Sequence, residues 1–238
     1  MISFRQALLA FRNRAAVAAA ALVVLTAGRG LAEEAQAKPH RHPYHLFRLQ
    51  VFELSTLQTA AIVMLGDSIT EAGPWEELTG CRSLVNRGIG GDTTAGVLAR
   101  LDGVTRLKPR AVFLMIGVND VTLDVAPGQT VANYRAILDR LAAADVHTIA
   151  TFVLPAARSY GKPRINAKIT QLDEAIAAAL PGRPQVTPLD LRPLMRTGDG
   201  FLREDLTYDG LHLTAKGYAI WRDAIAPQIA EYCTRSPD

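Results

Sequence analysis

The chain alternates short runs of apolar residues with longer stretches in which apolar and polar residues repeat at helical spacing. The apolar runs are bounded by turn residues, which is typical of strands buried on both faces of a parallel sheet. The predicted strands are residues 62–65, 83–86, 111–116, 147–154 and 186–191. The predicted helices are residues 93–101, 130–143, 165–180 and the segment from 214 onward. Strands that alternate with helices predict one α/β domain, a three-layer α/β/α sandwich with a central, mainly parallel sheet of about five strands.

The first 37 residues have the composition of a signal peptide. Arg5, Arg12 and Arg14 precede an uncharged apolar stretch over 15–27. Small residues at 35–37 offer a cleavage site, and a cut after Ala32 is the alternative. Because the apolar stretch is too short to span a bilayer comfortably, we expect cleavage and a secreted or periplasmic protein without a stable membrane span. The alternative is an uncleaved signal that anchors the protein.

The remaining chain divides into an arm and a domain. We expect residues 38–59 to form an N-terminal arm, with a solvated tail over 38–44 and an irregular segment or short helix over 46–57. Residues 60–238 then form the folded domain, in which no internal repeat or low-complexity linker interrupts the pattern.

Charge and cysteine content narrow the class of protein. The formal charge is +3, and without residues 1–37 it falls to +1, from 22 basic and 21 acidic residues. No basic stripe with interleaved aromatic residues is present, so we expect no nucleic-acid partner.

Cys81 and Cys233 are the two cysteines. In an oxidising compartment they form either one disulfide or two buried free thiols, and the sequence leaves both open.

Polar residues follow three of the predicted strands. Ser68 comes after the first strand, a glycine-rich turn over 88–91 after the second, and Asn119 after the third. Each alone has an ordinary explanation, since serine caps helices and glycine and asparagine occur in turns. The carboxyl ends of parallel strands, however, meet at one edge of the sheet, where ligands bind. That edge would gather a nucleophile, exposed backbone N–H groups and a carboxamide donor.

Asp209 and His212 add a possible general base. They stand three residues apart across a glycine-containing turn, just before the last predicted helix. A histidine bonded to a carboxylate is held in one tautomer and stabilised when protonated, although such a turn is also common on protein surfaces. Together with Ser68 the pair supplies what acyl transfer needs. No metal-ligand spacing is present, and the scheme requires no metal or organic cofactor.

At this point the sequence resembles the SGNH, or GDSL-type, hydrolases. The four blocks that define this family appear in order, at residues 66–68 (Gly-Asp-Ser), 88–92 (Gly-Ile-Gly-Gly-Asp), 117–120 (Gly-Val-Asn-Asp) and 209–212 (Asp-Gly-Leu-His). The resemblance covers about residues 60–232 and implies the flavodoxin-like α/β/α fold of the family. It also implies a serine hydrolase.

The resemblance assigns roles residue by residue. Ser68 corresponds to the nucleophile, His212 to the base and Asp209 to the acid that orients it. The backbone N–H groups of Ser68 and Gly91 and the side-chain amide of Asn119 correspond to the oxyanion hole. Gly90 replaces Gly91 if the alignment shifts by one residue.

Within this family, the sequence segment over residues 65–100 is most similar to platelet-activating-factor acetylhydrolase-like esterases and carbohydrate acetylesterases. We therefore expect an exported serine esterase that acts on small-molecule or carbohydrate esters of short acyl groups, acetyl first among them. A lysophospholipase or thioesterase of the same fold is the main alternative, and a non-catalytic carbohydrate-binding module is a more remote one. The sequence indicates neither the natural ester nor the oligomeric state.

Overall fold

The computed structural model describes residues 42–162 and 164–233, so the predicted signal segment lies outside the described residues. Five strands form one sheet in the order β2-β1-β3-β4-β5, and every neighbouring pair is parallel. The strands are β1 Ile62–Gly66, β2 Leu84–Gly88, β3 Ala111–Met115, β4 His147–Thr151 and β5 Val186–Leu189. This order places β1 and β3 side by side at the point where the winding reverses, which is where open α/β sheets bind ligands.

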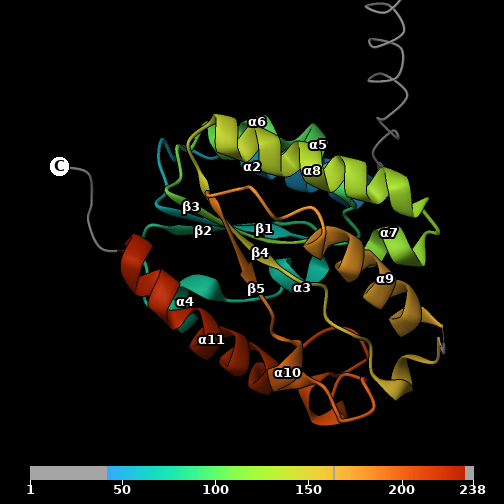
Figure 1. Cartoon of the computed structure of the whole chain (residues 1–238). Coiled ribbons are helices and arrows are strands. Elements are labelled where there is room, and N and C mark those ends of the chain that lie inside the picture. Colours follow the sequence, from blue (N-terminus) through green and yellow to red (C-terminus); the bar gives the residue numbers. More distant parts are fainter. Residues whose placement is uncertain (1–41, 163, 234–238) are drawn as a thin grey trace, which may run out of the picture. The chain divides into compact units, whose positions relative to one another are not determined.

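Helices cover both faces of the sheet, as the alternating pattern predicts (Figure 1). One face carries α5 (Thr94–Ala99), α6 (Leu101–Thr105) and α8 (Pro127–Ala143), and α9 (Ile165–Ala177) packs against α8. The other face carries α4 (Trp75–Thr79) and α11 (Ala215–Cys233). The remaining short helices are α3 (Ser68–Glu71), α7 (Val118–Thr122), α10 (Arg192–Met195), η1 (Arg158–Tyr160) and η2 (Glu204–Leu206). The three-layer α/β/α fold is therefore confirmed.

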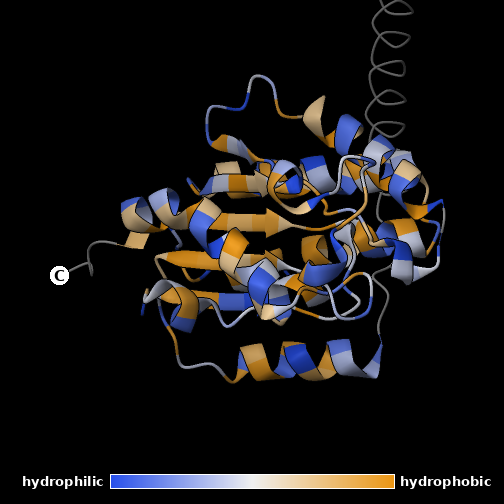
Figure 2. Cartoon of the chain, turned by 90° about the horizontal axis from the view of Figure 1, so that it is seen from below, coloured by the Kyte–Doolittle hydropathy of each residue, from blue (hydrophilic) through white to orange (hydrophobic). Residues whose placement is uncertain are grey.

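The core lies on both faces of the central strands. All residues of β1 and β3 are buried, and the strands in Figure 2 are predominantly hydrophobic, whereas the helices also carry hydrophilic residues. Each fully buried aliphatic side chain of this kind contributes about 1.5–3 kcal/mol to folding. On the α4–α11 side, the ring of Trp75 packs edge-on against Trp221, with ring centroids 4.8 Å apart, and against Tyr218.

Several elements end earlier than the apolar pattern predicts, among them β5, which ends at Leu189 rather than 191, and α9, which ends at Ala177 rather than 180. The β4 strand stops at Thr151 rather than 154, since the N–H of Val153 donates to the carboxylate of Asp173 instead of a neighbouring strand. The predicted helix over 93–101 breaks at Arg100, whose side chain reaches Asp92.

The N-terminal arm contains a helix, α2, over Pro43–Glu53. The helix begins within the predicted solvated tail, because His42 caps it and Pro43 occupies its first turn, where a missing N–H costs nothing. The prediction of a tail up to residue 44 is therefore wrong for its last residues.

Cys81 and Cys233 form a disulfide that ties the end of α11 to the loop after α4. Within residues 42–162 and 164–233, no helix is both long enough and apolar enough to cross a membrane.

Candidate active site

Ser68 is the first residue of α3, two positions beyond the end of β1. A side chain would not fit at Gly66, where a Cβ would lie 2.3 Å from the carbonyl oxygen of Met115 on the neighbouring strand. Asp67 caps the helix, and its Oδ1 accepts the N–H of Ile69 at 3.0 Å. Ser68 is thus held at the sheet edge with its own N–H at a helix start, where no intrahelical acceptor exists.

His212 stands 144 residues after Ser68 in the sequence, and the fold brings the two side chains together. Its Nε2 lies 2.9 Å from Ser68 Oγ, and its Nδ1 lies 2.5 Å from Asp209 Oδ2. The other carboxylate oxygen of Asp209 accepts the backbone N–H groups of Leu211 and His212, at 2.9 and 2.8 Å. The three residues predicted as nucleophile, base and acid therefore form one continuous chain of hydrogen bonds.

Gly210 makes the tight turn between the acid and the histidine possible. Its φ is +90°, and a Cβ there would lie 2.4 Å from the backbone nitrogen of Tyr160. The Gly210 carbonyl also accepts the N–H of Ala157 at 2.7 Å. Only glycine combines this backbone conformation with so close an approach.

The charge on Asp209 favours one tautomer of His212. Partial burial alone would raise the pKa of Asp209, but hydrogen bonds from His212 and Leu211 outweigh burial and lower it. The ionised carboxylate holds a proton on Nδ1, so Nε2 is left to accept the proton of the serine hydroxyl. The exposed ring of Tyr208 stacks on His212 with centroids 5.8 Å apart.

The glycine-rich turn after β2 lies against Ser68. A Cβ on Gly90 would be 3.8 Å from the Cβ of Ser68. The N–H of Gly90 donates to Glu71 Oε2 at 2.7 Å and is therefore occupied. Gly91 has φ +75°, and among the hydrogen bonds of the described residues its N–H has no acceptor.

Asn119 comes from α7, which follows β3. One of its two Nδ2 hydrogens is donated to the carbonyl oxygen of Asp92 at 2.8 Å, so the second hydrogen remains for a ligand. The next residue, Asp120, accepts both the N–H and the hydroxyl of Thr94, at 2.9 and 2.5 Å. These contacts fix the β3 turn to the start of α5, beside the glycine-rich turn.

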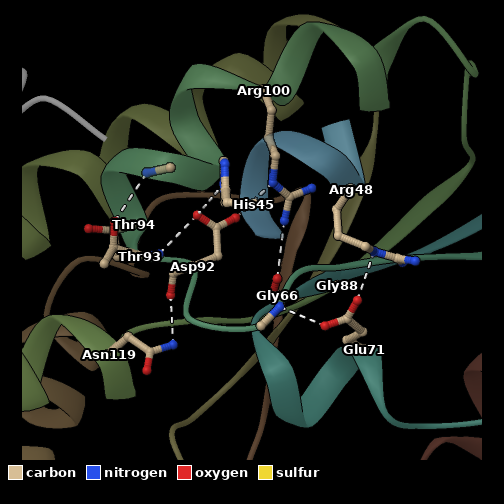
Figure 3. Close-up of polar contacts among 12 residues, drawn as sticks. His45, Arg48, Gly66, Glu71, Gly88, Asp92, Thr93, Thr94, Arg100 and Asn119 are labelled. Atoms are coloured by element: carbon tan, nitrogen blue, oxygen red, sulfur yellow. Dashed lines mark hydrogen bonds and ion pairs between the residues drawn. The ribbon is translucent and has the colours of Figure 1, made fainter. Parts of the chain in front are cut away.

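Asp92 is a buried carboxylate that joins three segments (Figure 3). Arg100 Nε donates to Asp92 Oδ2 at 2.7 Å, and a further nitrogen of Arg100 donates to the carbonyl of Gly66 at 3.1 Å. His45 of α2 places Nε2 3.1 Å from Asp92 Oδ1. The network therefore connects the end of β1, the glycine-rich turn and the N-terminal helix.

Glu71 makes a second connection to α2. Its Oε1 accepts the hydroxyl of Tyr44 at 2.7 Å and lies 2.7 Å from Arg48 Nε in an ion pair, while Oε2 binds Gly90. Sequence reasoning missed both contacts of α2. His45 is 47 residues from its partner, and no spacing rule links positions so far apart.

Burial also affects the acid next to the nucleophile. It is the main cause that raises the pKa of Asp67 to about 7, and the nearby carboxyl groups of Asp92 and Asp120 add to the effect. At neutral pH this carboxyl group is therefore partly protonated, which reduces the negative charge beside Ser68. In the part of the chain that the structure describes, no cluster of three or more histidine, cysteine or acidic side chains is placed to hold a metal ion.

Comparison with known proteins identifies similar sequences. The model of the GDSL-like Lipase/Acylhydrolase family matches residues 64–220. Platelet-activating factor acetylhydrolase IB subunit alpha1 of Homo sapiens is 31% identical over 165 residues, which cover 66% of this chain and 70% of that protein.

Solved structures agree on the fold. A protein from Streptococcus pneumonia that is described as a platelet activating factor superposes on this chain with a TM-score of 0.70. The two are 26% identical, and the superposition covers 88% of this chain and 99% of the other. A GDSL-like lipase from Bacteroides thetaiotaomicron superposes with a TM-score of 0.67 at 23% identity, over 79% and 97% of the two chains. Because the Bacteroides thetaiotaomicron protein is only 23% identical, its similarity supports the fold alone.

Proposed function

The chain belongs to the GDSL-like lipase/acylhydrolase family of hydrolases acting on ester bonds, and from this premise we propose that it is an exported serine esterase working through an acyl-enzyme on Ser68. The proposed substrates are small-molecule or carbohydrate esters of short acyl groups, with acetyl as the first candidate. The observation that carries the proposal is the hydrogen-bonded chain from Ser68 Oγ through His212 to Asp209.

Each of the three hydrogen-bonded residues has one role in the proposed reaction. Ser68 Oγ attacks the ester carbonyl carbon while His212 Nε2 takes the hydroxyl proton. Asp209 stabilises the imidazolium that forms. The same proton then passes to the leaving alcohol oxygen, and the C–O bond of the ester breaks. Water repeats the sequence on the acyl-enzyme and releases the carboxylic acid.

The oxyanion that develops on the carbonyl oxygen needs donors. We assign the N–H groups of Ser68 and Gly91 and the free Nδ2 hydrogen of Asn119 to this role. The contact between Gly90 and Glu71 supports Gly91 over its neighbour, since the Gly90 N–H is already bonded. A donor of this kind is typically responsible for about 10²–10³ in kcat.

Export is proposed on two grounds. Residues 1–37 have the pattern of a signal peptide, and the bridged pair Cys81–Cys233 suits an oxidising compartment.

The test is a panel of p-nitrophenyl esters of increasing acyl length together with acetylated sugars, with Ser68→Ala as the blank. We expect turnover of short-chain esters by the parent chain and a loss of several orders of magnitude in the variant. Preference for lysophospholipids or thioesters would favour the alternative within the same fold. Failure to hydrolyse any member would favour a non-catalytic carbohydrate-binding role.

A further inference from the structure

The ring of His45 on helix α2 is buried against the turn that carries the proposed oxyanion hole (Figure 3). Only 4% of this residue is exposed, and its Nε2 lies 3.1 Å from Asp92 Oδ1. Because a carboxylate accepts hydrogen bonds and donates none, Nε2 carries the proton of this contact. Among the described residues, Nδ1 of the same ring has no hydrogen-bond partner. The ring therefore makes one polar contact, and that contact is to Asp92.

Packing alone does not explain a histidine at this position. An apolar ring of similar size would fill the same space, and it would not leave a buried nitrogen unpaired, which costs free energy of folding. What only the imidazole supplies here is the hydrogen bond to Asp92. The effect of that bond on Asp92 is therefore the better explanation for the residue.

The carboxylate of Asp92 is held through both of its oxygens. Oδ1 accepts the N–H of Thr93 at 3.0 Å in addition to the bond from His45, and Oδ2 forms an ion pair with Arg100 at 2.7 Å. The carboxylate fits because residue 96 is glycine, where a Cβ would lie 1.8 Å from Oδ1. These contacts fix the side chain of Asp92 and, with it, the peptide groups on either side of this residue.

Those peptide groups support two of the proposed oxyanion donors. The carbonyl oxygen of Asp92 accepts one Nδ2 hydrogen of Asn119 at 2.8 Å, which sets the direction of the second hydrogen. The N–H of Asp92 donates to the carbonyl of Ile89 at 3.1 Å and closes the turn in which Gly91 has φ +75°. A displacement of Asp92 would therefore move the Gly91 N–H and the Asn119 amide together.

We propose that His45 is a positioning residue of the oxyanion hole. It holds Asp92 so that the Gly91 N–H and the free Asn119 hydrogen point to the place where the oxyanion develops. The role rests on the proposed function, because it requires the ester carbonyl to be polarised by these donors. It also gives the reaction a dependence on helix α2, which precedes the matched family region of residues 64–220.

The test replaces His45 by phenylalanine and by glutamine and measures hydrolysis of p-nitrophenyl acetate, with Ser68→Ala as the blank. Phenylalanine fills the space and donates nothing, whereas the glutamine amide can donate to Asp92 from nearly the position of Nε2. We expect His45→Phe to lower kcat at least about 10-fold and to change KM less than about 2-fold, since misplaced donors weaken binding of the transition state. His45→Gln should keep kcat within about 3-fold of the parent.

His147 provides the matched control. Its Nε2 also lies 2.9 Å from a side-chain oxygen, that of Thr187, but His147 is the first residue of β4, at the end of the strand away from the site. His147→Phe should therefore keep the parental kcat. His45→Asn is a second loss variant, because its shorter amide does not reach Asp92, and it replaces His45→Phe if that variant does not fold. Thermal melts of all variants allow kcat to be expressed per folded molecule.

A double-mutant cycle with Asn119→Ala shows whether His45 acts through the donors. If it does, the fold-loss in kcat from His45→Phe should be at least about threefold smaller when Asn119 is already alanine, since residues of one network are not additive. A merely structural role of His45 would give the same fold-loss in both backgrounds.

The outcomes separate this inference from the proposed function. If the parent hydrolyses no ester beyond the Ser68→Ala blank, the proposed function fails and the role of His45 fails with it. If the parent is active and the loss variants keep its kcat per folded molecule, the function stands and the positioning role is overturned. The role is also overturned if His45→Gln loses as much kcat as His45→Phe, or if the losses from His45→Phe and Asn119→Ala simply multiply.

Discussion

At the scale of single residues, the site depends on which donors are already occupied. The N–H of Gly90 is bonded to Glu71, and one Nδ2 hydrogen of Asn119 is bonded to Asp92. What remains is the Gly91 N–H and the second hydrogen of Asn119, together with the Ser68 N–H at its helix start. These free donors define where a negative oxygen would be stabilised.

We predict that Asn119→Ala lowers kcat by about 10²–10³ and changes KM little, because the lost donor acts mainly in the transition state. Asn119→Asp should be at least as damaging, since a carboxylate would face the oxyanion. Loss of the bond to Asp92 should cost about 1 kcal/mol, or about 2–4 °C in Tm. Steady-state kinetics and thermal melts measure the three quantities. If both variants melt many degrees lower while kcat per folded molecule stays within a few-fold of the parent, Asn119 is structural.

Residue roles differ in how far the sequence could predict them. Ser68 and Asn119 directly follow apolar strands, and Asp209 and His212 are close in the chain, so spacing alone brings them into consideration. His45 gave no such signal, because its partner is distant in sequence and belongs to a turn whose side-chain directions depend on the fold.

At the scale of elements, the strands were the most predictable part of the molecule. The runs that became β1 and β3 are buried on both faces, so their apolar pattern is continuous. Element ends were less predictable, since they depend on tertiary hydrogen bonds such as the one from the Val153 N–H to Asp173. Helix α2 was the least predictable, because polar residues hold it to the domain through Glu71 and Asp92.

Glu71 is where α2 and the glycine-rich turn meet, and we predict that Glu71→Gln lowers kcat about 10-fold. Glutamine offers one acceptor oxygen where the carboxylate uses both, so either the Gly90 N–H or the α2 side loses its partner. A tenfold loss corresponds to about 1.4 kcal/mol of transition-state stabilisation. The matched control is Glu77→Gln on the exposed surface of α4. Equal kcat values for the two variants would show that Glu71 does not position the turn.

At the scale of the whole molecule, the Cys81–Cys233 disulfide closes a long loop. The two cysteines are 152 residues apart, so the bond restricts most of the domain in the unfolded state. The sequence left bridged and free thiols equally open, because pairing depends on the distance between two remote segments.

We predict that replacing both cysteines by alanine lowers the free energy of unfolding by up to about 5 kcal/mol, as chain entropy gives for a loop of this length. Urea titration of the parent and the double variant measures the difference. Protein prepared from an oxidising compartment and denatured without reductant should show no reactive thiol. Two titratable thiols in that preparation would contradict the bridge.

The assignment of Ser68 as the nucleophile is tested most directly by covalent labelling with a fluorophosphonate, followed by mass spectrometry of the intact chain and of its peptides. We expect one adduct per folded chain, located on Ser68. The adduct should be absent from Ser68→Ala and from heat-unfolded protein, and it should form far more slowly in His212→Ala, which lacks the base. An adduct on another residue, or esterase activity that persists in Ser68→Ala, would contradict the assignment of Ser68 as the nucleophile.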